Sequence, residues 1–385
     1  MRLLFGILFV LSLMLLGTPP EKAHAAAVPK LEVSGWIPYW RAASGTLDAF
    51  NNLDTLTEIN PFGFGVSSDG QITDPMHINE EHWVSLITAA KQKKVRVIPT
   101  VMWSDGAAIH RILSTTESRI ELEDSITALV IASGFDGIDI DFEGKYAETR
   151  PYFSTFLKGL YQRMGNKWVM CTIEARTPLS SRYEGTPPPG AGIYANDFVA
   201  INKYCDRVRL MTYDQGSIDV QLNAANNGPY VPIADSKWVE KVVKLTAQTI
   251  PKRKLVIGIA TYGYEYTMTP RTEGYRYNLV SAFNPGYARE LVEKFHLTPV
   301  RNSAGELNMT YITDVPPPPI ANPLNLPVAS AQTKAMGTLS IAWWSDAKAV
   351  ADKIALAKKL QVRGVALFKI DGGEDPDLWN AVRKR

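Results

Sequence analysis

The chain has 385 residues, which is long enough for one large domain or two small ones. Its 41 basic and 39 acidic side chains nearly balance, and this excludes the concentrated basic face that is usual in nucleic-acid-binding proteins. The apolar share of 45% is ordinary for a globular protein with a large core. No glycine-rich signature for binding phosphate occurs in the sequence.

The N-terminus has the pattern of a secretory signal peptide. Arg2 precedes an apolar run over residues 3–16, and Ala23 and Ala25 supply the small residues of a cleavage site. The run is shorter than the ~20 residues needed to span a bilayer, which disfavours an uncleaved membrane anchor. We therefore expect residues 1–25 to be removed and the mature chain to be secreted, without stable membrane association.

Apolar, strand-like runs alternate with helix-like segments along most of the chain. The strand candidates are residues 31–39, 58–65, 95–103, 134–143, 168–176, 207–214, 254–262 and 364–370. The helix-like segments are residues 81–94, 116–133, 152–166, 195–203, 237–249 and 347–360. This alternation predicts a parallel sheet, and eight strands are the number that closes a barrel. We expect an α/β fold, a (β/α)8 TIM barrel over residues 28–385, with a doubly wound open sheet as the alternative.

One connection interrupts this rhythm, between the seventh strand and the helix expected at residue 347. It contains a helix-like segment at 288–295, a strand-like segment at 306–312 and a proline-rich stretch at 316–327. A connection of this length either serves a function or carries a small fold of its own. We expect a small α+β insertion over residues 265–340, in which residues 316–319 form a stiff extended link. A loop without structure is the alternative.

The most informative stretch, residues 135–143, reads Phe-Asp-Gly-Ile-Asp-Ile-Asp-Phe-Glu. Side chains alternate between the two faces of a strand, so Asp139, Asp141 and Glu143 share one face, toward the barrel interior. Three carboxyls this close repel each other strongly if all are ionised, so some must hold protons at neutral pH. A carboxylic acid is thereby kept available as a proton donor. Glu143 lies last, at the C-terminal mouth where barrel enzymes act. Asp136 has the opposite parity, which favours a structural hydrogen bond.

An acidic line of this kind can instead hold Mg²⁺ or Ca²⁺, because both ions prefer oxygen ligands. The sequence offers no obvious second cluster of acidic ligands, so we expect neither a metal nor a cofactor. The two cysteines, Cys171 and Cys205, are too few for a disulfide scaffold and fit no metal-binding spacing. Cys171 lies inside an apolar run, which favours a buried free thiol.

The pattern Asp-Gly-x-Asp-x-Asp-x-Glu, formed here by Asp136, Gly137, Asp139, Asp141 and Glu143, resembles the signature of the family 18 glycoside hydrolases. These are the chitinase-like enzymes, which carry the signature at the end of the fourth barrel strand. The resemblance implies a (β/α)8 barrel and a glycosidase activity without a cofactor.

The resemblance extends over most of the mature chain. Residues 211–214, Met-Thr-Tyr-Asp, resemble the family's Met-x-Tyr-Asp at the end of the sixth strand. The insertion resembles the small α+β domain of many members. The ending Gly-Gly-Glu-Asp-Pro at 372–376 is similar to that of a bacterial branch that includes spore-cortex and peptidoglycan-directed members.

The resemblance also implies a role for each matching side chain. Glu143 is implied to protonate the glycosidic oxygen while the substrate's own 2-acetamido group attacks the anomeric carbon, with net retention of configuration. Asp141 is implied to orient the acetamide N–H, and Asp139 to lie deeper and share a proton with Asp141. Tyr213 is implied to hold the acetamide carbonyl, and Asp214 to help seat the sugar.

Phe368 departs from the family pattern. Family members usually end the eighth strand with a tryptophan that forms the floor under the scissile sugar, and Phe368 has that place here. Phenylalanine can stack on a sugar face, but with less area. The departure therefore bears on substrate preference and affinity, and the same chemistry is still expected.

Further substrate contacts are expected from side chains near the ends of the strands. The candidates are Trp36, Tyr39, Trp103, Trp344 and Met211. The alternatives are that Trp36 belongs to the core and that Tyr39 packs against a neighbouring loop.

The leading hypothesis is a hydrolase that acts on β-1,4-linked N-acetylglucosamine in chitin or peptidoglycan. Its partner is then a polysaccharide containing N-acetylglucosamine, and the protein is expected to act as a monomer. A sugar-binding lectin on the same fold is the alternative, although such members commonly lose the glutamate that is present here as Glu143. A metal-dependent hydrolase is a third possibility, which inhibition by chelators would support.

Overall fold

The computed structural model describes residues 30–272, 274–313 and 338–384. The expected signal peptide and the proline-rich stretch lie outside the described residues. Within the described ranges, no helix has the length and apolar character needed to cross a membrane.

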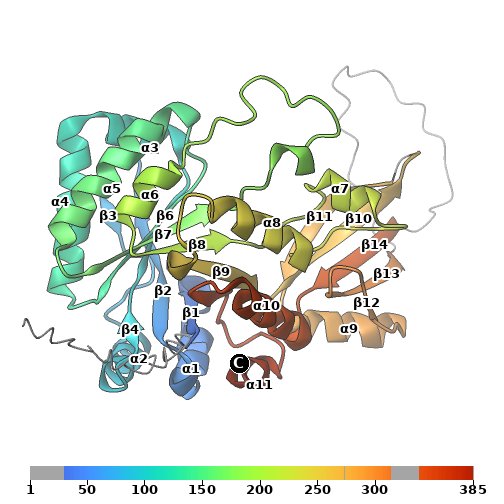
Figure 1. Cartoon of the computed structure of the whole chain (residues 1–385). Coiled ribbons are helices and arrows are strands. Elements are labelled where there is room, and N and C mark those ends of the chain that lie inside the picture. The colour runs from blue at the N-terminus through green and yellow to red at the C-terminus, as the bar shows by residue number, and fades with distance from the viewer. Residues whose placement is uncertain (1–29, 273, 314–337, 385) are drawn as a thin grey trace, which may run out of the picture. The chain divides into compact units, whose positions relative to one another are not determined.

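A closed barrel of eight parallel strands forms the centre of the fold (Figure 1). Its strands are β1 (Glu32–Pro38), β2 (Glu58–Val66), β5 (Thr100–Trp103), β6 (Gly137–Phe142), β7 (Trp168–Glu174), β8 (Arg207–Met211), β9 (Leu255–Ala260) and β15 (Gly364–Phe368). Each strand pairs in parallel with the next, and β1 pairs with both β15 and β2, which closes the sheet. The expected (β/α)8 barrel is confirmed, and the open doubly wound sheet is excluded. Two short strands, β3 (Ile72–Thr73) and β4 (Arg96–Val97), extend the pairing of β2.

Helices surround the barrel and cover the outward faces of its strands (Figure 1). They are α1 (Ala42–Asn51), α2 (Glu81–Gln92), α3 (Gly106–Ser114), α4 (Thr116–Ala132), α5 (Arg150–Met164), α6 (Phe198–Tyr204), α8 (Ser236–Thr246), α10 (Ala347–Leu360) and α11 (Leu378–Arg383), with the short α7 (Val220–Ala224) before α8. Aspartates cap the N-termini of several of them: Asp235 accepts the N–H of Lys237 at 2.7 Å, and Asp346 accepts the N–H of Ala349 at 3.0 Å.

Asp136 has the structural role that its parity predicts. It accepts the N–H of Val97 at 2.8 Å, so its carboxylate links two neighbouring strands.

A second, antiparallel sheet is inserted between β9 and α10. Its strand order is β11-β10-β14-β13-β12, built from β10 (Gly263–Pro270), β11 (Tyr275–Phe283), β12 (Val300–Arg301), β13 (Leu307–Thr313) and β14 (Thr338–Trp344). Helix α9 (Pro285–Phe295) packs its Ala288 and Leu291 against Met309 and Trp344 of this sheet. The fold is therefore a TIM barrel with a small α+β insertion after the seventh strand. The strands of the insertion begin at residue 263, two residues before the expected range 265–340, and end at residue 344, four residues after it.

The buried carboxylate of Glu306 ties the insertion to the barrel. It accepts the backbone N–H groups of Ile233 and Ala234, both at 2.9 Å, and the indole N–H of Trp343 at 2.7 Å. Lys353 of α10 lies 3.4 Å from the same carboxylate. A buried charge with this many donors is compensated, and it fixes where the insertion stands beside the mouth of the barrel.

Candidate active site

The acidic line of Asp139, Asp141 and Glu143 follows β6 to the C-terminal mouth of the barrel. Asp139 and Asp141 are buried in the barrel interior, and Glu143, directly after the strand, is half-buried. Phe142 points the other way, into the apolar core under the helices. The backbone N–H of Glu143 donates to the carbonyl of Trp103 at 2.8 Å, so the pairing with β5 continues one residue beyond β6.

Asp139 lies deepest and is surrounded by donors. Its carboxylate accepts hydrogen bonds from the indole of Trp36 at 3.1 Å, from Thr100 at 2.9 Å and from Thr172 at 2.9 Å. The guanidinium of Arg209 forms an ion pair with it at 2.7 Å. These partners come from four different barrel strands, so closure of the barrel assembles the base of the site.

Asp141 is less compensated than Asp139. Burial, together with the charges of Glu143 and Asp139, raises the pKa of Asp141 well above its ordinary value, although Lys145 opposes this rise. Its Oδ1 atom has no hydrogen-bond partner within the described residues. Asp141 therefore holds a proton more readily than an ordinary aspartate and presents an unused acceptor.

Glu143 also holds its proton to a higher pH than an ordinary glutamate. Burial raises the pKa of Glu143, and the charges of Glu174 and Asp214 raise it further, whereas Lys145 lowers it. Glu174 ends the neighbouring strand β7 and accepts a hydrogen bond from Asn196 at 2.6 Å. The side chain of Lys145 is only 1% exposed and lies 3.8 Å from Glu174.

Tyr213 lies two residues after β8 and is buried under the mouth of the barrel. Burial, with the charge of Asp141 as the next cause, raises the pKa of Tyr213 well above its ordinary value, so the phenol keeps its proton. Its ring stacks on that of Phe368 at 5.3 Å. Gly258 makes room for this ring, because a Cβ there would lie 2.8 Å from it and 2.5 Å from the carbonyl of Leu210.

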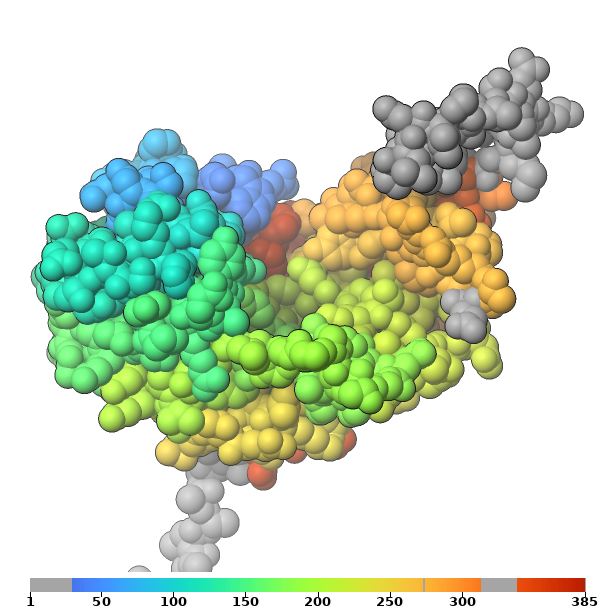
Figure 2. Space-filling view, turned by 90° about the horizontal axis from the view of Figure 1, so that it is seen from above, coloured from blue at the N-terminus to red at the C-terminus, as the bar shows by residue number. Residues whose placement is uncertain are grey.

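Asp214 faces a cavity beside the acidic line. Its carboxylate accepts hydrogen bonds from the phenols of Tyr262 at 2.5 Å and Tyr264 at 2.9 Å. The cavity has a volume of about 430 Å³ and is lined by Trp40, Arg41, Asp214, Tyr262, Tyr264, Ala282, Phe283, Asn284, Phe368, Lys369 and Asp371. Figure 2 shows a hollow between the N-terminal segments and the orange insertion, with red residues of the C-terminal segment at its floor.

Three tryptophans that the sequence suggests as sugar platforms are core residues instead. Trp36 is 1% exposed and donates to Asp139 inside the barrel. Trp103 is 4% exposed and packs edge-on against Phe142, on the outer face of the sheet. Trp344 is 4% exposed and belongs to the core of the insertion. Trp103 therefore lies on the outer face of the sheet, whereas Trp36 lies on the inner face but deep in the barrel, and all three side chains are covered.

The remaining expected contact residues lie at the mouth. Tyr39 is 39% exposed, and its ring meets the edge of Trp40, which lines the cavity next to Asp214. Met211, the last residue of β8, is half-buried. Phe368 ends β15 and lines the same cavity.

Several groups at the site were not singled out from the sequence. Tyr262 and Tyr264 come from the end of β9 and the start of the insertion, and Glu174 and Arg209 come from β7 and β8. Lys145 follows Glu143 by two residues. Glu174 could have been found from the sequence, because it ends β7 at the level where Glu143 follows β6. The contacts of the two tyrosines with Asp214 could not, because they depend on how the strands pair in the folded protein.

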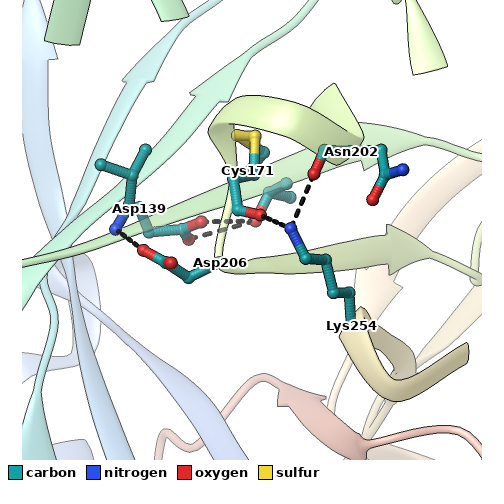
Figure 3. The surroundings of a disulfide bond; sticks show 8 residues. Asp139, Cys171, Asn202, Asp206 and Lys254 are labelled. Carbon is teal, nitrogen blue, oxygen red and sulfur yellow. Dashed lines mark hydrogen bonds between the residues drawn. A yellow bond between two sulfur atoms is a disulfide. The ribbon is translucent and has the colours of Figure 1, made fainter. Parts of the chain in front are cut away.

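The expectation of a free thiol is wrong, because Cys171 and Cys205 form a disulfide with a Cα–Cα distance of 5.9 Å. Cys171 lies on β7 and Cys205 is the C-cap of α6, two residues before β8, so the bond ties β7 to the connection that leads into the adjacent strand (Figure 3). Lys254 donates to the carbonyls of Asn202 at 2.6 Å and of Cys205 at 2.9 Å beside it. Thr172, next to Cys171, is one of the residues that donate to Asp139.

Comparison with known proteins shows the family of the chain. The model of glycosyl hydrolases family 18 matches residues 35–373. The chain belongs to this family. It is 23% identical over 308 residues to an uncharacterized glycosylase of Bacillus subtilis, YvbX, and the match covers 77% of each chain.

Solved structures of a spore cortex-lytic enzyme and of a chitinase resemble this fold. The spore cortex-lytic enzyme SleL of Bacillus cereus superposes with a TM-score of 0.68 at 18% identity, over 92% of this chain and 74% of that one. A chitinase from Chromobacterium violaceum gives the same TM-score and identity over 92% of this chain and 98% of that one. At this identity, the likeness shows that the fold is shared.

Proposed function

We propose that this family 18 glycosidase cleaves β-1,4 bonds of N-acetylglucosamine in chitin or peptidoglycan, with retention of configuration. The substrate's acetamido oxygen is the nucleophile and Glu143 is the acid. The observation that carries the proposal is the environment of Glu143: a half-buried carboxyl at the barrel mouth whose pKa is raised, directly above the buried Asp141.

Glu143 protonates the glycosidic oxygen as the bond to the anomeric carbon breaks. A donor must still hold its proton at the working pH, and burial with two neighbouring carboxylates gives Glu143 this property. The same carboxylate then takes a proton from the water that opens the oxazolinium intermediate. A single acid is enough for both steps because the second carboxylate of ordinary glycosidases is replaced by the acetamide.

Asp141 receives the acetamide N–H. A buried acceptor that lacks a hydrogen bond costs about 1–3 kcal/mol, so an incoming N–H at its unpartnered Oδ1 removes this cost. The bond turns the acetamide oxygen toward the anomeric carbon. Once Glu143 has given up its proton, the negative charge of the acidic line stabilises the positive charge that develops on the ring as the oxazolinium forms.

Tyr213 and Asp214 hold the sugar from the side of β8. The phenol of Tyr213 remains a donor across the working range, because the pKa of Tyr213 is raised, and it binds the acetamide carbonyl. Asp214 is held in place by Tyr262 and Tyr264 and accepts a sugar hydroxyl from the cavity. Phe368 provides the apolar floor on which the sugar stacks.

A substrate of this kind lies outside the cell, in a wall or in a foreign polymer. The expected export signal over residues 1–25 agrees with such a substrate, and we include secretion in the proposal. The names of similar proteins include both a chitinase and a spore cortex-lytic enzyme, so both polymers are retained as substrates.

The test is digestion of chitin and of purified peptidoglycan, with the new reducing-end sugar identified by mass spectrometry and the first-formed anomer by NMR. The proposal predicts N-acetylglucosamine ends of β configuration from at least one polymer. Binding of a fluorogenic chitobioside without release of the fluorophore would support a lectin instead. Inversion of configuration would exclude the acetamide mechanism.

A further inference from the structure

The cavity beside the acidic line has a wall that the proposed mechanism does not use, formed by the residues that follow β1. Tyr39, Trp40 and Arg41 make a short 3-10 helix directly after this strand. Trp40 and Arg41 line the same cavity as Asp214 and Phe368. Trp40 is 50% exposed, and the side chain of Arg41 is 50% exposed as well. An aromatic ring and a cation are therefore presented side by side to the contents of the cavity.

Aromatic rings connect the floor of the site with this wall. The ring of Phe368 lies 5.9 Å from that of Phe62 on β2, and the ring of Phe62 lies 5.8 Å from that of Trp40, both pairs edge to face. Phe62 is buried, whereas Trp40 reaches the surface. A sugar that stacks on Phe368 therefore has Trp40 as the next exposed aromatic surface on this side. A neighbouring sugar of the same chain can pack there.

Arg41 has a guanidinium that is almost without partners. Its one ion pair within the described residues joins Nε to Asp371 at 3.9 Å, and none of its N–H groups donates a hydrogen bond there. Asp371 has closer partners, because Lys369 forms a hydrogen-bonded ion pair with it and Asn284 donates to both of its oxygens, at 3.2 and 3.0 Å. Burial alone would raise the pKa of Asp371, but the bonds from Lys369 and Asn284 lower it below its ordinary value, so the carboxylate stays charged.

This wall of the cavity therefore has a positive charge that its own carboxylate does not need. Arg41 and Lys369 lie beside the single carboxylate of Asp371, and Lys369 contacts it more closely. A guanidinium offers five N–H donors in a planar fork that matches the shape of a carboxylate. An acid group on a sugar that packs against Trp40 can bind Arg41 without breaking any hydrogen bond of the protein.

Chitin and peptidoglycan differ in this property. Chitin is built from N-acetylglucosamine alone and has no carboxylate. In peptidoglycan, N-acetylglucosamine alternates with N-acetylmuramic acid, whose lactyl group either ends in a carboxylate or carries a peptide with carboxylates of its own. When N-acetylglucosamine lies on Phe368, both of its neighbours are N-acetylmuramic acid. The unit that reaches Trp40 then brings an acid group, whichever way the chain runs.

We propose that Arg41 binds a carboxylate of the sugar next to the scissile N-acetylglucosamine, so that peptidoglycan is preferred to chitin. This inference rests on the proposed function, because it names the substrate class of the same site. Trp40 and Arg41 supply the preference, while Glu143 and Asp141 supply the chemistry. Chitooligosaccharides, which lack the acid group, remain substrates with one contact fewer.

The test compares Arg41→Met with the wild type on three substrates: peptidoglycan strands freed of their peptides by an amidase, strands that keep their peptides, and chitooligosaccharides. We expect kcat/KM on acidic strands to fall by about 5- to 20-fold in R41M, near the lower end for a hydrogen bond to a charged group because Arg41 is half-exposed. The value on chitooligosaccharides is expected to stay unchanged. The strand that loses rate shows whether the lactyl or a peptide carboxylate is bound. An equal loss on all three substrates, or no loss on either strand, would overturn the proposal.

Arg289→Met is the matched control. Arg289 is an exposed arginine of α9 that lines a separate cavity, so its loss changes the net charge equally and leaves the wall intact. R289M should keep the wild-type ratio of rates on strands and chitooligosaccharides; an equal change in R289M would show a long-range effect of charge and overturn the contact.

Salt supplies a readout that a merely structural role of Arg41 would not move. Raising NaCl from about 50 to 500 mM screens exposed charges, so it should weaken the action of the wild type on acidic strands more than that of R41M. Arg41→Lys keeps the charge without the planar fork and is expected to retain this salt dependence at a lower rate. Equal salt dependence in the wild type and R41M would contradict the role of the guanidinium.

Failure of this inference is distinguishable from failure of the proposed function. If the wild type releases no reducing ends from either polymer, the proposed function fails. Calorimetric binding of peptide-free strands to E143Q and to R41M/E143Q then tests Arg41 by itself, without turnover. Weaker binding to the double variant supports the carboxylate contact, and equal binding overturns it.

Discussion

The rings of Tyr213 and Phe368 stack with their centroids 5.3 Å apart and their planes 17° from parallel. Tyr213 follows β8 and Phe368 ends β15, so the contact spans the space above β9, which lies between these two strands in the sheet. Phe368 thus orients the phenol that we propose to bind the acetamide, in addition to providing the floor for the sugar. Phe368 has a smaller ring than tryptophan, but it still stacks on Tyr213 and can hold the phenol in place.

Replacing Phe368 tests the stacked pair. Phe368→Ala is expected to lower kcat/KM by roughly 2- to 10-fold through the pair alone, because an aromatic pair contributes about 0.5–1.5 kcal/mol beyond area burial. Phe368→Trp retains an aromatic ring and is expected to bind chitooligosaccharides at least as tightly as the wild type. Steady-state kinetics on a fluorogenic chitobioside measure both, and unchanged kinetics in F368A would contradict the contact's role.

Tyr213→Phe removes one hydroxyl and keeps the ring on Phe368. Loss of the donor to the acetamide carbonyl is expected to lower kcat/KM by about 10- to 100-fold, the equivalent of a hydrogen bond to a group that gains charge. Thermal unfolding should change little, because the buried ring remains. Tyr264→Phe is the control, since it removes a phenol that contacts only Asp214 among the catalytic groups named here; equal losses in the two variants would argue against the specific role of Tyr213.

The pH profile is expected to respond in opposite directions to two neighbours of Glu143. Activity falls as the pH rises through the pKa of the donor, because the donor loses its proton. Glu174 raises the pKa of Glu143 and Lys145 lowers it. Glu174→Gln should therefore move the basic limb of kcat/KM to lower pH, and Lys145→Met should move it to higher pH. Shifts in the same direction would show that these charges do not act on Glu143.

The disulfide is expected to stabilise the barrel. It joins positions 34 residues apart, and a cross-link of this kind typically contributes about 2–4 kcal/mol to the free energy of unfolding. The double variant C171A/C205A should unfold at a correspondingly lower denaturant concentration than the oxidised wild type. Wild-type protein treated with a reductant should unfold at the same denaturant concentration as the variant. The reductant should not change the unfolding of the variant itself, which controls for effects of the reductant other than reduction of the disulfide.

Much of the barrel could be predicted from the sequence because its signals are local. Apolar runs mark the strands, and parity on β6 alone puts Asp139, Asp141 and Glu143 on the inner face. The family signature adds Tyr213 and Asp214.

What the sequence missed depends on contacts between distant strands. Arg209 meets Asp139 only when β6 and β8 stand in the closed barrel, and Tyr262 reaches Asp214 through the register there. The disulfide likewise depends on the pairing of β7 with β8, which brings Cys171 of β7 close to Cys205 at the end of α6, just before β8. Trp103 lies on the outer face of the sheet, which its place at a strand end does not show, and Trp36 lies on the inner face but too deep to be exposed.

The most direct test of the account is turnover by Glu143→Gln. The amide is nearly the same size as the acid and cannot donate a proton as an acid does, so we expect loss of nearly all release from a fluorogenic chitobioside while binding of chitooligosaccharides is preserved. Glu148→Gln, an exposed change in the short 3-10 helix Ala147–Thr149, serves as the matched control and should retain full activity. Wild-type rates in the Glu143 variant would contradict the assignment of the proton donor, and with it the proposed mechanism.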